Sequence, residues 1–140
     1  MSNQDCIFCK IAAGDIPCFK IYETEHLLSF LDIGPVNKGH ALVIPKEHYK
    51  NIWDLPAELG GEIITAAQMA GDAIVKATGA DGLNIIMNNN EAAGQLVFHA
   101  HLHLIPRFRD DGFKHWAQSQ YDNMDEARAL AQKIEKMIKG

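Results

Sequence analysis

The stretch FHAHLHLIPR, Phe98–Arg107, places His99, His101 and His103 at every second position, with one apolar residue between each pair. Side chains alternate between the two faces of a β-strand, so this pattern predicts a strand that is buried on one face. We expect the strand to run over Leu96–Pro106. The three imidazoles then share one face, while the apolar face packs against a helix.

The rest of the chain divides into segments with two different periods. Four short apolar runs, separated by polar residues or by Gly and Pro, predict further strands. Two longer segments, 56–78 and about 123–139, repeat apolar residues every three or four positions, which is helical spacing. These elements indicate an α+β domain with an antiparallel sheet of about five strands, one long central helix and a C-terminal helix. The four strand runs are Cys18–Glu23, His26–Ile33, His40–Pro45 and Leu83–Asn88.

Length, composition and charge narrow the class of protein. A chain of 140 residues that is 47% hydrophobic predicts a single domain over residues 1–140 with a substantial core. The net charge of -5 and the scattered Lys and Arg residues speak against nucleic acid as a partner. No apolar stretch reaches membrane-spanning length, and the first residues do not form a signal peptide. We therefore expect a cytoplasmic protein that does not bind membranes.

The histidine row has three interpretations, which differ in their chemistry. The row is a polar face that happens to hold histidines, or it binds one metal ion, or it contains a nucleophile. His99 and His103 are about 13 Å apart along a straight strand, whereas a zinc–nitrogen bond measures about 2.0–2.1 Å, so only adjacent pairs could share an ion. A neutral imidazole is a good nucleophile, because its pKa is about 6.5. His101 has a neighbour on each side, which makes it the natural attacking group at a phosphorus or carbonyl centre.

The segment HAHLHLIPR fits the pattern His-φ-His-φ-His-φ-φ, where φ is apolar, and resembles the histidine triad (HIT) superfamily of nucleotide-binding hydrolases and transferases. CIFCKIAAGDIPCFKIYE (6–23) is similar to the N-terminus of bacterial and Hint-like members, and LSFLDIGPVNKGHALVIPKEH (28–48) to their nucleoside-binding stretch. PRFRDDGF (106–113) resembles the branch that includes bacterial HIT proteins and Fhit-like dinucleoside polyphosphate hydrolases. The resemblance implies that His101 attacks the α-phosphate of a purine nucleotide derivative, such as a phosphoramidate, a dinucleoside polyphosphate or an aminoacyl adenylate. A nucleotidyl-histidine intermediate then forms, and water releases the mononucleotide.

The same resemblance implies roles for the residues around the nucleophile. His103 would contact the phosphate or assist the leaving group, and His99 would help to orient the row. Asp32 would hold the ribose hydroxyls. The other implied nucleotide contacts are Ile33 and Phe30 at the base, and Asn88, Gln95, Leu96 and Val97 on the phosphate side.

Leu96 departs from the pattern of the family. Many relatives have Ser or Thr after the Gly-Gln pair, whereas this chain reads GQLV. A hydrogen bond to a charged phosphate contributes about 1.5–3 kcal/mol, so we expect the rate or the choice of substrate to differ. The departure also leaves open a nucleotide-binding or protein-interaction module with little turnover.

The pair Cys6-x-x-Cys9 has the spacing of a zinc knuckle, although two ordinary thiols or a redox pair would look the same in sequence. The resemblance to zinc-containing relatives implies that His48 and His99 complete a closed, structural zinc site. The zinc-knuckle segment would then be residues 1–20. The resemblance further implies a homodimer, with the long helix and a neighbouring strand at the interface.

Overall fold

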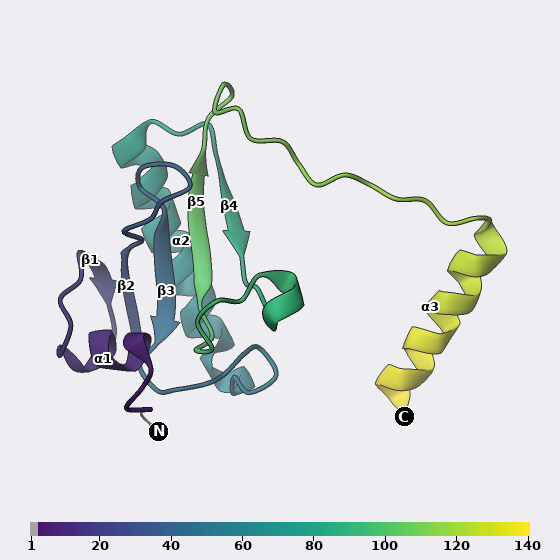
Figure 1. Ribbon diagram of the computed structural model, residues 1–140, viewed down its shortest axis with the longest axis horizontal. Coiled ribbons are helices and arrows are strands. Elements are labelled where there is room, and N and C mark those ends of the chain that lie inside the picture. Colours follow the sequence, from purple (N-terminus) through teal and green to yellow (C-terminus); the bar gives the residue numbers. More distant parts are fainter. Residues whose placement is uncertain (1–2) are drawn as a thin grey trace.

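Five short strands form one sheet in the order β1-β2-β3-β5-β4 in the computed structural model, which describes residues 3–140 (Figure 1). Neighbouring strands all pair antiparallel. The α+β class and the antiparallel sheet predicted from the sequence are thereby confirmed. The strands are β1 Lys20–Glu23, β2 Leu27–Leu31, β3 Ala41–Pro45, β4 Gly82–Ile86 and β5 Leu102–Arg107. The helices are α1 Ile7–Ala13, α2 Gly60–Thr78 and α3 Met124–Lys139, with short 3₁₀ turns η1 at Ala57–Leu59 and η2 at Glu91–Ala93.

Helix α2 covers one face of the sheet (Figure 1). Its buried side consists of small residues apart from Ile74, and the small residues, among them Ala70 and Gly71, allow the helix to approach the strands closely. A Cβ atom on Gly71 would lie 2.7 Å from Cδ2 of Leu83, so this glycine serves packing and offsets its cost of about 1 kcal/mol within a helix. The core on this face consists of Leu27, Ala41, Val43, Ala66, Ala67, Ala70, Ile74 and Leu104.

Helix α1 lies against the opposite face of β2 and β3, where Phe8 joins a second apolar cluster. The sequence pattern does not predict this helix, since seven residues are too few to show a period of 3.6. Local contacts fix its two ends. The sulfur of Cys6 accepts a hydrogen bond from the backbone N–H of Cys9 at 3.4 Å, and Gly14 ends the helix with a φ of 86°. The second cluster consists of Phe8, Leu28, Phe30, Leu42 and Ile44.

The prediction of a strand over the whole of Leu96–Pro106 is wrong in its first half, because β5 begins at Leu102. The chain bends before that point, where Ala100 N–H donates to the carbonyl oxygen of Tyr49 at 2.6 Å instead of to a neighbouring strand. His99 therefore lies in the bend, His101 lies between the bend and β5, and only His103 belongs to β5.

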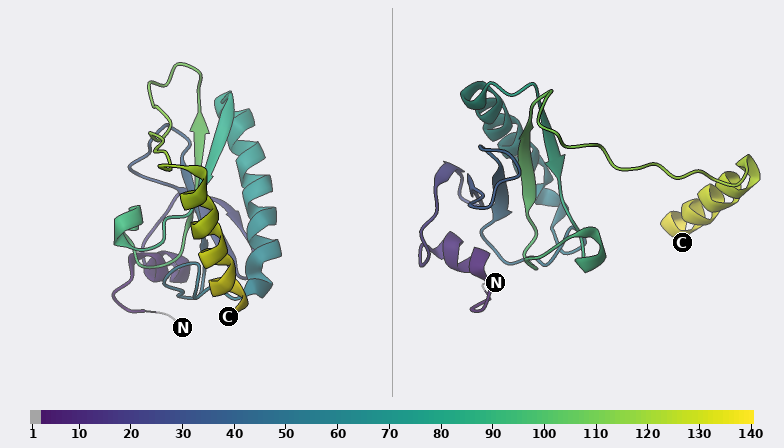
Figure 2. Two further views of the ribbon diagram at one scale, coloured as in Figure 1. Left: turned by 90° about the vertical axis from the view of Figure 1, so that its right-hand side faces the viewer. Right: turned by 45° about the horizontal axis from the view of Figure 1, so that its top comes forward.

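Helix α3 begins and ends close to the predicted bounds, but it lies apart from the sheet and from α2 (Figures 1 and 2). Asn123 caps it by accepting a hydrogen bond from the backbone N–H of Glu126 at 2.9 Å. An extended segment, residues 112–121, carries the chain from the end of the sheet to this helix. Within residues 3–140, no helix combines the length and the hydrophobicity that crossing a membrane requires.

Candidate functional site

His101 lies at a pocket of about 350 Å3 between α1, β2 and the bend that precedes β5. Its Nδ1 atom is 2.7 Å from the carbonyl oxygen of His99. A carbonyl oxygen only accepts hydrogen bonds, so Nδ1 of the neutral ring carries the proton and Nε2 keeps its lone pair. The backbone thus fixes the tautomer that a nucleophilic Nε2 requires.

Burial keeps the imidazoles at this pocket neutral. It lowers the pKa of His101 below the ordinary value, although the carbonyl oxygen of His99 and the carboxylate of Asp32 counteract part of that effect. The pKa of His103 is lowered to about 4, chiefly by burial and to a lesser extent by the neighbouring imidazoles of His101 and His40. Phe8 contributes to the burial, since its ring centroid is 5.1 Å from that of His101. Near neutral pH the site therefore offers a nucleophile without positive charge.

A hydrogen-bond chain fixes the tautomer of His103 as well. The backbone N–H of Val36 donates to Nδ1 of His40 at 3.0 Å, so the proton of neutral His40 lies on Nε2. That proton points to Nδ1 of His103, 2.9 Å away, which leaves the proton of His103 on its Nε2 atom. His103 can therefore donate a hydrogen bond to a ligand, while His101 can attack it.

No catalytic or binding role is predicted for His40 from the sequence. Its position one residue before the apolar strand β3 indicates a buried polar group, but the contact with His103 depends on the pairing of β3 with β5. The carboxylate of Asp32 lies 3.7 Å from Nε2 of His40 and belongs to the same group of side chains.

The structure brings most of the expected nucleotide contacts to the one pocket. Ile33 and Leu96 are its most exposed large apolar side chains, and Leu96 is 87% exposed. Helix α1 also lines the pocket, which the sequence did not indicate because the helix itself was not predicted. The expected residues that line the pocket are Phe30, Asp32, Ile33, Asn88, Leu96, Val97, His101 and His103.

Gln95 lies outside this lining. Its side chain is only 1% exposed, and the side-chain amide group makes hydrogen bonds with three backbone groups. Nε2 donates to the carbonyl oxygens of Lys50 at 2.6 Å and Val97 at 3.1 Å, and Oε1 accepts from the N–H of Asn90 at 2.7 Å. Gln95 therefore holds the loop that carries Leu96 and Val97, and any effect on a ligand passes through that loop.

Cys6, Cys9, His48 and His99 form a separate cluster next to the pocket. Nδ1 of His99 is 3.4 Å from the sulfur of Cys6 and 3.5 Å from that of Cys9, and Nδ1 of His48 is 3.3 Å from the sulfur of Cys9. Nε2–H of His99 donates to the carbonyl oxygen of Pro45 at 2.8 Å, so its Nδ1 lone pair faces the two sulfurs. The third imidazole of the row thus faces these thiols, whereas the other two line the pocket.

The four donor atoms fit one tetrahedral metal ion. They all lie within 4.8 Å of one another. A tetrahedral zinc ion with bonds of about 2.3 Å to sulfur and about 2.0–2.1 Å to nitrogen places a sulfur and a nitrogen about 3.6 Å apart, close to the separations in the cluster. Burial also lowers the pKa of His99 to about 4, which keeps the imidazole neutral, as binding of a metal ion requires.

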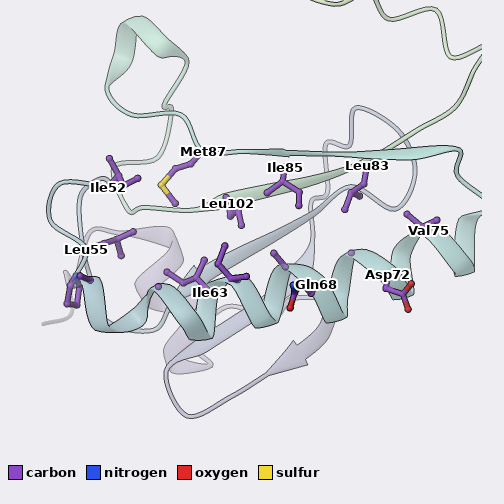
Figure 3. A pocket seen from close by; sticks show the side chains of 16 residues that line it. Ile52, Leu55, Ile63, Gln68, Asp72, Val75, Leu83, Ile85, Met87 and Leu102 are labelled. Carbon is purple, nitrogen blue, oxygen red and sulfur yellow. The ribbon is translucent and has the colours of Figure 1, made fainter. Parts of the chain in front are cut away.

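A larger hollow of about 720 Å3 lies on the other side of the sheet, between α2 and β4 (Figure 3). Ile63, Leu83, Ile85 and Met87 point toward one another across it. Its lining is apolar apart from two residues of α2, Gln68 and Asp72. Asp72, the one titratable residue in its lining, pairs with Lys76 at 2.7 Å, and the rest of the lining has the composition of a packing surface.

Among known protein families, the model of the HIT domain matches residues 13–110. The adenylylsulfatase HINT3 of Arabidopsis thaliana is 45% identical over 109 residues, which cover 78% of this chain and 55% of that protein. The adenosine 5'-monophosphoramidase hnt1 of Schizosaccharomyces pombe is 42% identical over 137 residues, which cover 97% of this chain and all of that protein (100%).

Solved structures show the same fold. SMU.412c from Streptococcus mutans superposes with a TM-score of 0.92 at 48% identity, covering 98% of this chain and 87% of that one. A zinc-bound histidine triad family protein from Mycobacterium smegmatis superposes with a TM-score of 0.75 at 39% identity, covering 94% of this chain and 97% of that one.

Proposed function

This chain belongs to the HIT family, and we propose on that basis that it is an enzyme that cleaves purine nucleotide derivatives at the α-phosphate. The observation that carries the proposal is the hydrogen bond of 2.7 Å from Nδ1 of His101 to the carbonyl oxygen of His99, which leaves Nε2 free to attack. The relatives named as an adenylylsulfatase and an adenosine 5'-monophosphoramidase support this class of substrate. Phosphoramidates and dinucleoside polyphosphates are the candidates that we propose.

The reaction proceeds in two displacements. Nε2 of His101 attacks the α-phosphorus, a P–N bond to the imidazole forms, and the bond to the leaving group breaks; a nucleotide leaves as its phosphate anion, and an amine leaves with a proton taken up from solvent. Nε2–H of His103 donates a hydrogen bond to the phosphate or to the departing atom. The carbonyl oxygen of His99 stabilises the positive charge that His101 acquires. Water then attacks the phosphorus and releases a proton to solvent, the bond from phosphorus to His101 breaks, and the nucleoside monophosphate leaves with His101 neutral again.

The pocket supports the binding of a nucleoside monophosphate unit. Asp32 offers a half-buried carboxylate for the ribose hydroxyls, and Phe30 and Ile33 offer an apolar wall for the base. Asn88 lies beside Gly94: a Cβ atom added to Gly94 would be 3.5 Å from Nδ2 of Asn88. The side-chain amide of Asn88 and the backbone of the loop therefore meet on the phosphate side of the pocket. Gln95 acts on binding through the loop that it holds.

We propose that the cluster of two cysteines and two histidines binds a structural zinc ion. Cys6, Cys9, His48 and His99 would hold it, and four protein ligands leave no position for a reacting water. When bound, the ion would tie the N-terminal segment to the bend before β5 and hold the His99 carbonyl in place. Residues 1–20, of which 3–20 are described, would be the zinc-knuckle segment of a single HIT domain that spans 1–140.

We further propose a cytoplasmic homodimer. Strand β4 is an edge of the sheet, and its Ile85 is 52% exposed beside the apolar hollow on α2. An open edge with apolar side chains exposes unpaired backbone groups, which a second copy can pair about a twofold axis. The open edge and the hollow are thus one continuous surface that a partner would cover.

Hydrolysis of adenosine phosphoramidate and of a diadenosine tetraphosphate tests the enzyme directly. We expect the wild-type protein to release AMP and the His101→Ala variant to lose more than about a hundredfold in kcat/KM. His115→Ala is the control, because His115 is an exposed histidine outside this pocket. Equal rates for the two variants would refute the role of His101.

A second candidate function is nucleotide binding with little turnover, which the exposed Leu96 at the pocket favours. Tight binding of AMP by the wild-type protein, with no AMP released from either substrate, would establish this candidate in place of the enzyme.

A further inference from the structure

Helix α3 has one apolar face that its own chain leaves uncovered. None of its side chains is buried, and Ile134 in the middle of that face is 51% exposed. The charged residues of the helix lie on the remaining sides, as the spacing of 100° per residue shows. The apolar face comprises Met124, Ala127, Leu130, Ala131, Ile134, Met137 and Ile138.

A helix of this kind needs a partner in order to be stable. Its 16 residues give a length of about 24 Å, and isolated helices of that size are marginally stable in water. Most helical stability comes from packing of the amphipathic face. The segment that leads to α3 also exposes aromatic side chains, with Trp116 83% exposed. Something other than the sheet and α2 of the same chain must therefore cover this face.

The direction in which the chain leaves the sheet indicates what that partner is. Arg107, the last residue of β5, pairs with Asp111 at 2.7 Å and donates to Oδ1 of Asn84 in β4 at 2.7 Å. The backbone N–H of Arg109 donates to the carboxylate of Asp81 at 2.9 Å. These bonds fix the start of the segment at the β4 side, and the segment then runs past the β4 edge to α3 (Figures 1 and 2).

The space between β4 and α3 is the space that a second copy would occupy. The open edge of β4 and the apolar hollow face that side. β4 has five residues, an edge of about 17 Å, which is short for an interface that buries about 800 Å2 on each partner. The apolar face of α3 and the segment before it would supply further area.

We propose that α3 is exchanged between two copies of this chain and packs its apolar face on the body of the partner. A twofold axis makes the exchange reciprocal, so each body gives one helix and receives one. This inference rests on the homodimer proposed above, and it adds α3 as the helix that stabilises this dimer.

Cross-linking of mixed subunits tests the exchange. Chains labelled with 14N and with 15N are refolded together or allowed to exchange, and an amine-reactive reagent then joins nearby lysines. Lys133, Lys136 and Lys139 of α3 should link to body lysines such as Lys50 and Lys76 in peptides that combine the two isotopes. A dimer whose α3 gives no mixed-isotope links to the body would overturn the exchange and leave the dimer standing. A monomer at micromolar concentration would refute both proposals.

A matched pair of variants provides a second measurement. Ile134→Glu places a charge on the apolar face, whereas Lys133→Gln makes the same change in net charge on the polar side of the helix. The dimer contains each contact twice, so Ile134→Glu should raise the dimer dissociation constant at least about a hundredfold, and Lys133→Gln by less than about threefold. Ile134 is exposed within its own chain, so the variant body should fold, as far-ultraviolet circular dichroism can verify. Equal dissociation constants for the two variants would contradict the proposal.

Discussion

Replacing Gln95 by Met tests how the pocket wall is held. The side chain is buried and makes three hydrogen bonds to the backbone of Lys50, Val97 and Asn90. Methionine has a similar volume, so the substitution removes the bonds without opening a large cavity. At a net contribution of about 1 kcal/mol for each bond, we expect the free energy of unfolding to fall by about 3 kcal/mol. The melting temperature should fall by about 10 °C.

The assay combines urea unfolding at one fixed protein concentration with steady-state kinetics. Because the freed loop carries Leu96 and Val97 at the pocket, KM for adenosine phosphoramidate should rise more than kcat falls. Gln132→Met, at an exposed position on the polar side of α3, should change the free energy of unfolding by less than about 0.5 kcal/mol. A loss below about 1 kcal/mol in Gln95→Met, with KM unchanged, would show that the loop is held by other contacts.

Three further substitutions or titrations follow from the site. Cys6→Ser should lose bound zinc, and its melting temperature should fall more than the turnover of the molecules that remain folded. Cys18→Ser is the control and should keep its zinc. Equal metal content of the two variants by mass spectrometry would contradict this. Leu96→Ser should have a kcat/KM for a phosphoramidate at least about tenfold higher than Leu96→Ala, because only serine adds a hydroxyl that can bond to the phosphate. Equal kcat/KM values would refute a contact between residue 96 and the phosphate. Burial lowers the pKa of His101 below 6.5, so the neutral, active form of the imidazole persists as the pH falls. The acid limb of the pH profile of kcat/KM should therefore have its midpoint below pH 6.5. A midpoint at or above pH 6.5 would be inconsistent with this burial.

The regular elements were predictable where the sequence carries a clear period. The segments that form β2, β3 and α2 show it, and their observed bounds fall within the predicted ones. The first half of the histidine strand was not predictable. The bond from Ala100 to Tyr49 and those of Gln95 join residues far apart in the sequence, and they override the local alternation. Helix α1 was missed because its seven residues are held by caps and by packing on the sheet.

The candidate site was predictable to the extent that the resemblance to the HIT family supplied it. The residues expected around His101 do lie together, and the four expected zinc ligands form one cluster. Two features needed the folded chain. His40 sets the tautomer of His103 only because β3 and β5 are neighbours, and Gln95 acts inside the wall of the pocket. The position of α3 could not be predicted either, because helical spacing of apolar residues predicts an apolar face but not which part of the protein covers that face.

The central claim is that Nε2 of His101 forms a covalent bond to phosphorus during turnover. The most direct measurement is the mass of the intact protein after millisecond mixing with adenosine phosphoramidate and a denaturing quench, followed by peptide mapping under conditions that preserve phosphoramidate bonds. We predict a species heavier by one adenylyl group, with the group on His101 and absent in His101→Ala. Continued release of AMP with no adduct in the wild-type protein at any mixing time, or an adduct on another residue, would contradict the account.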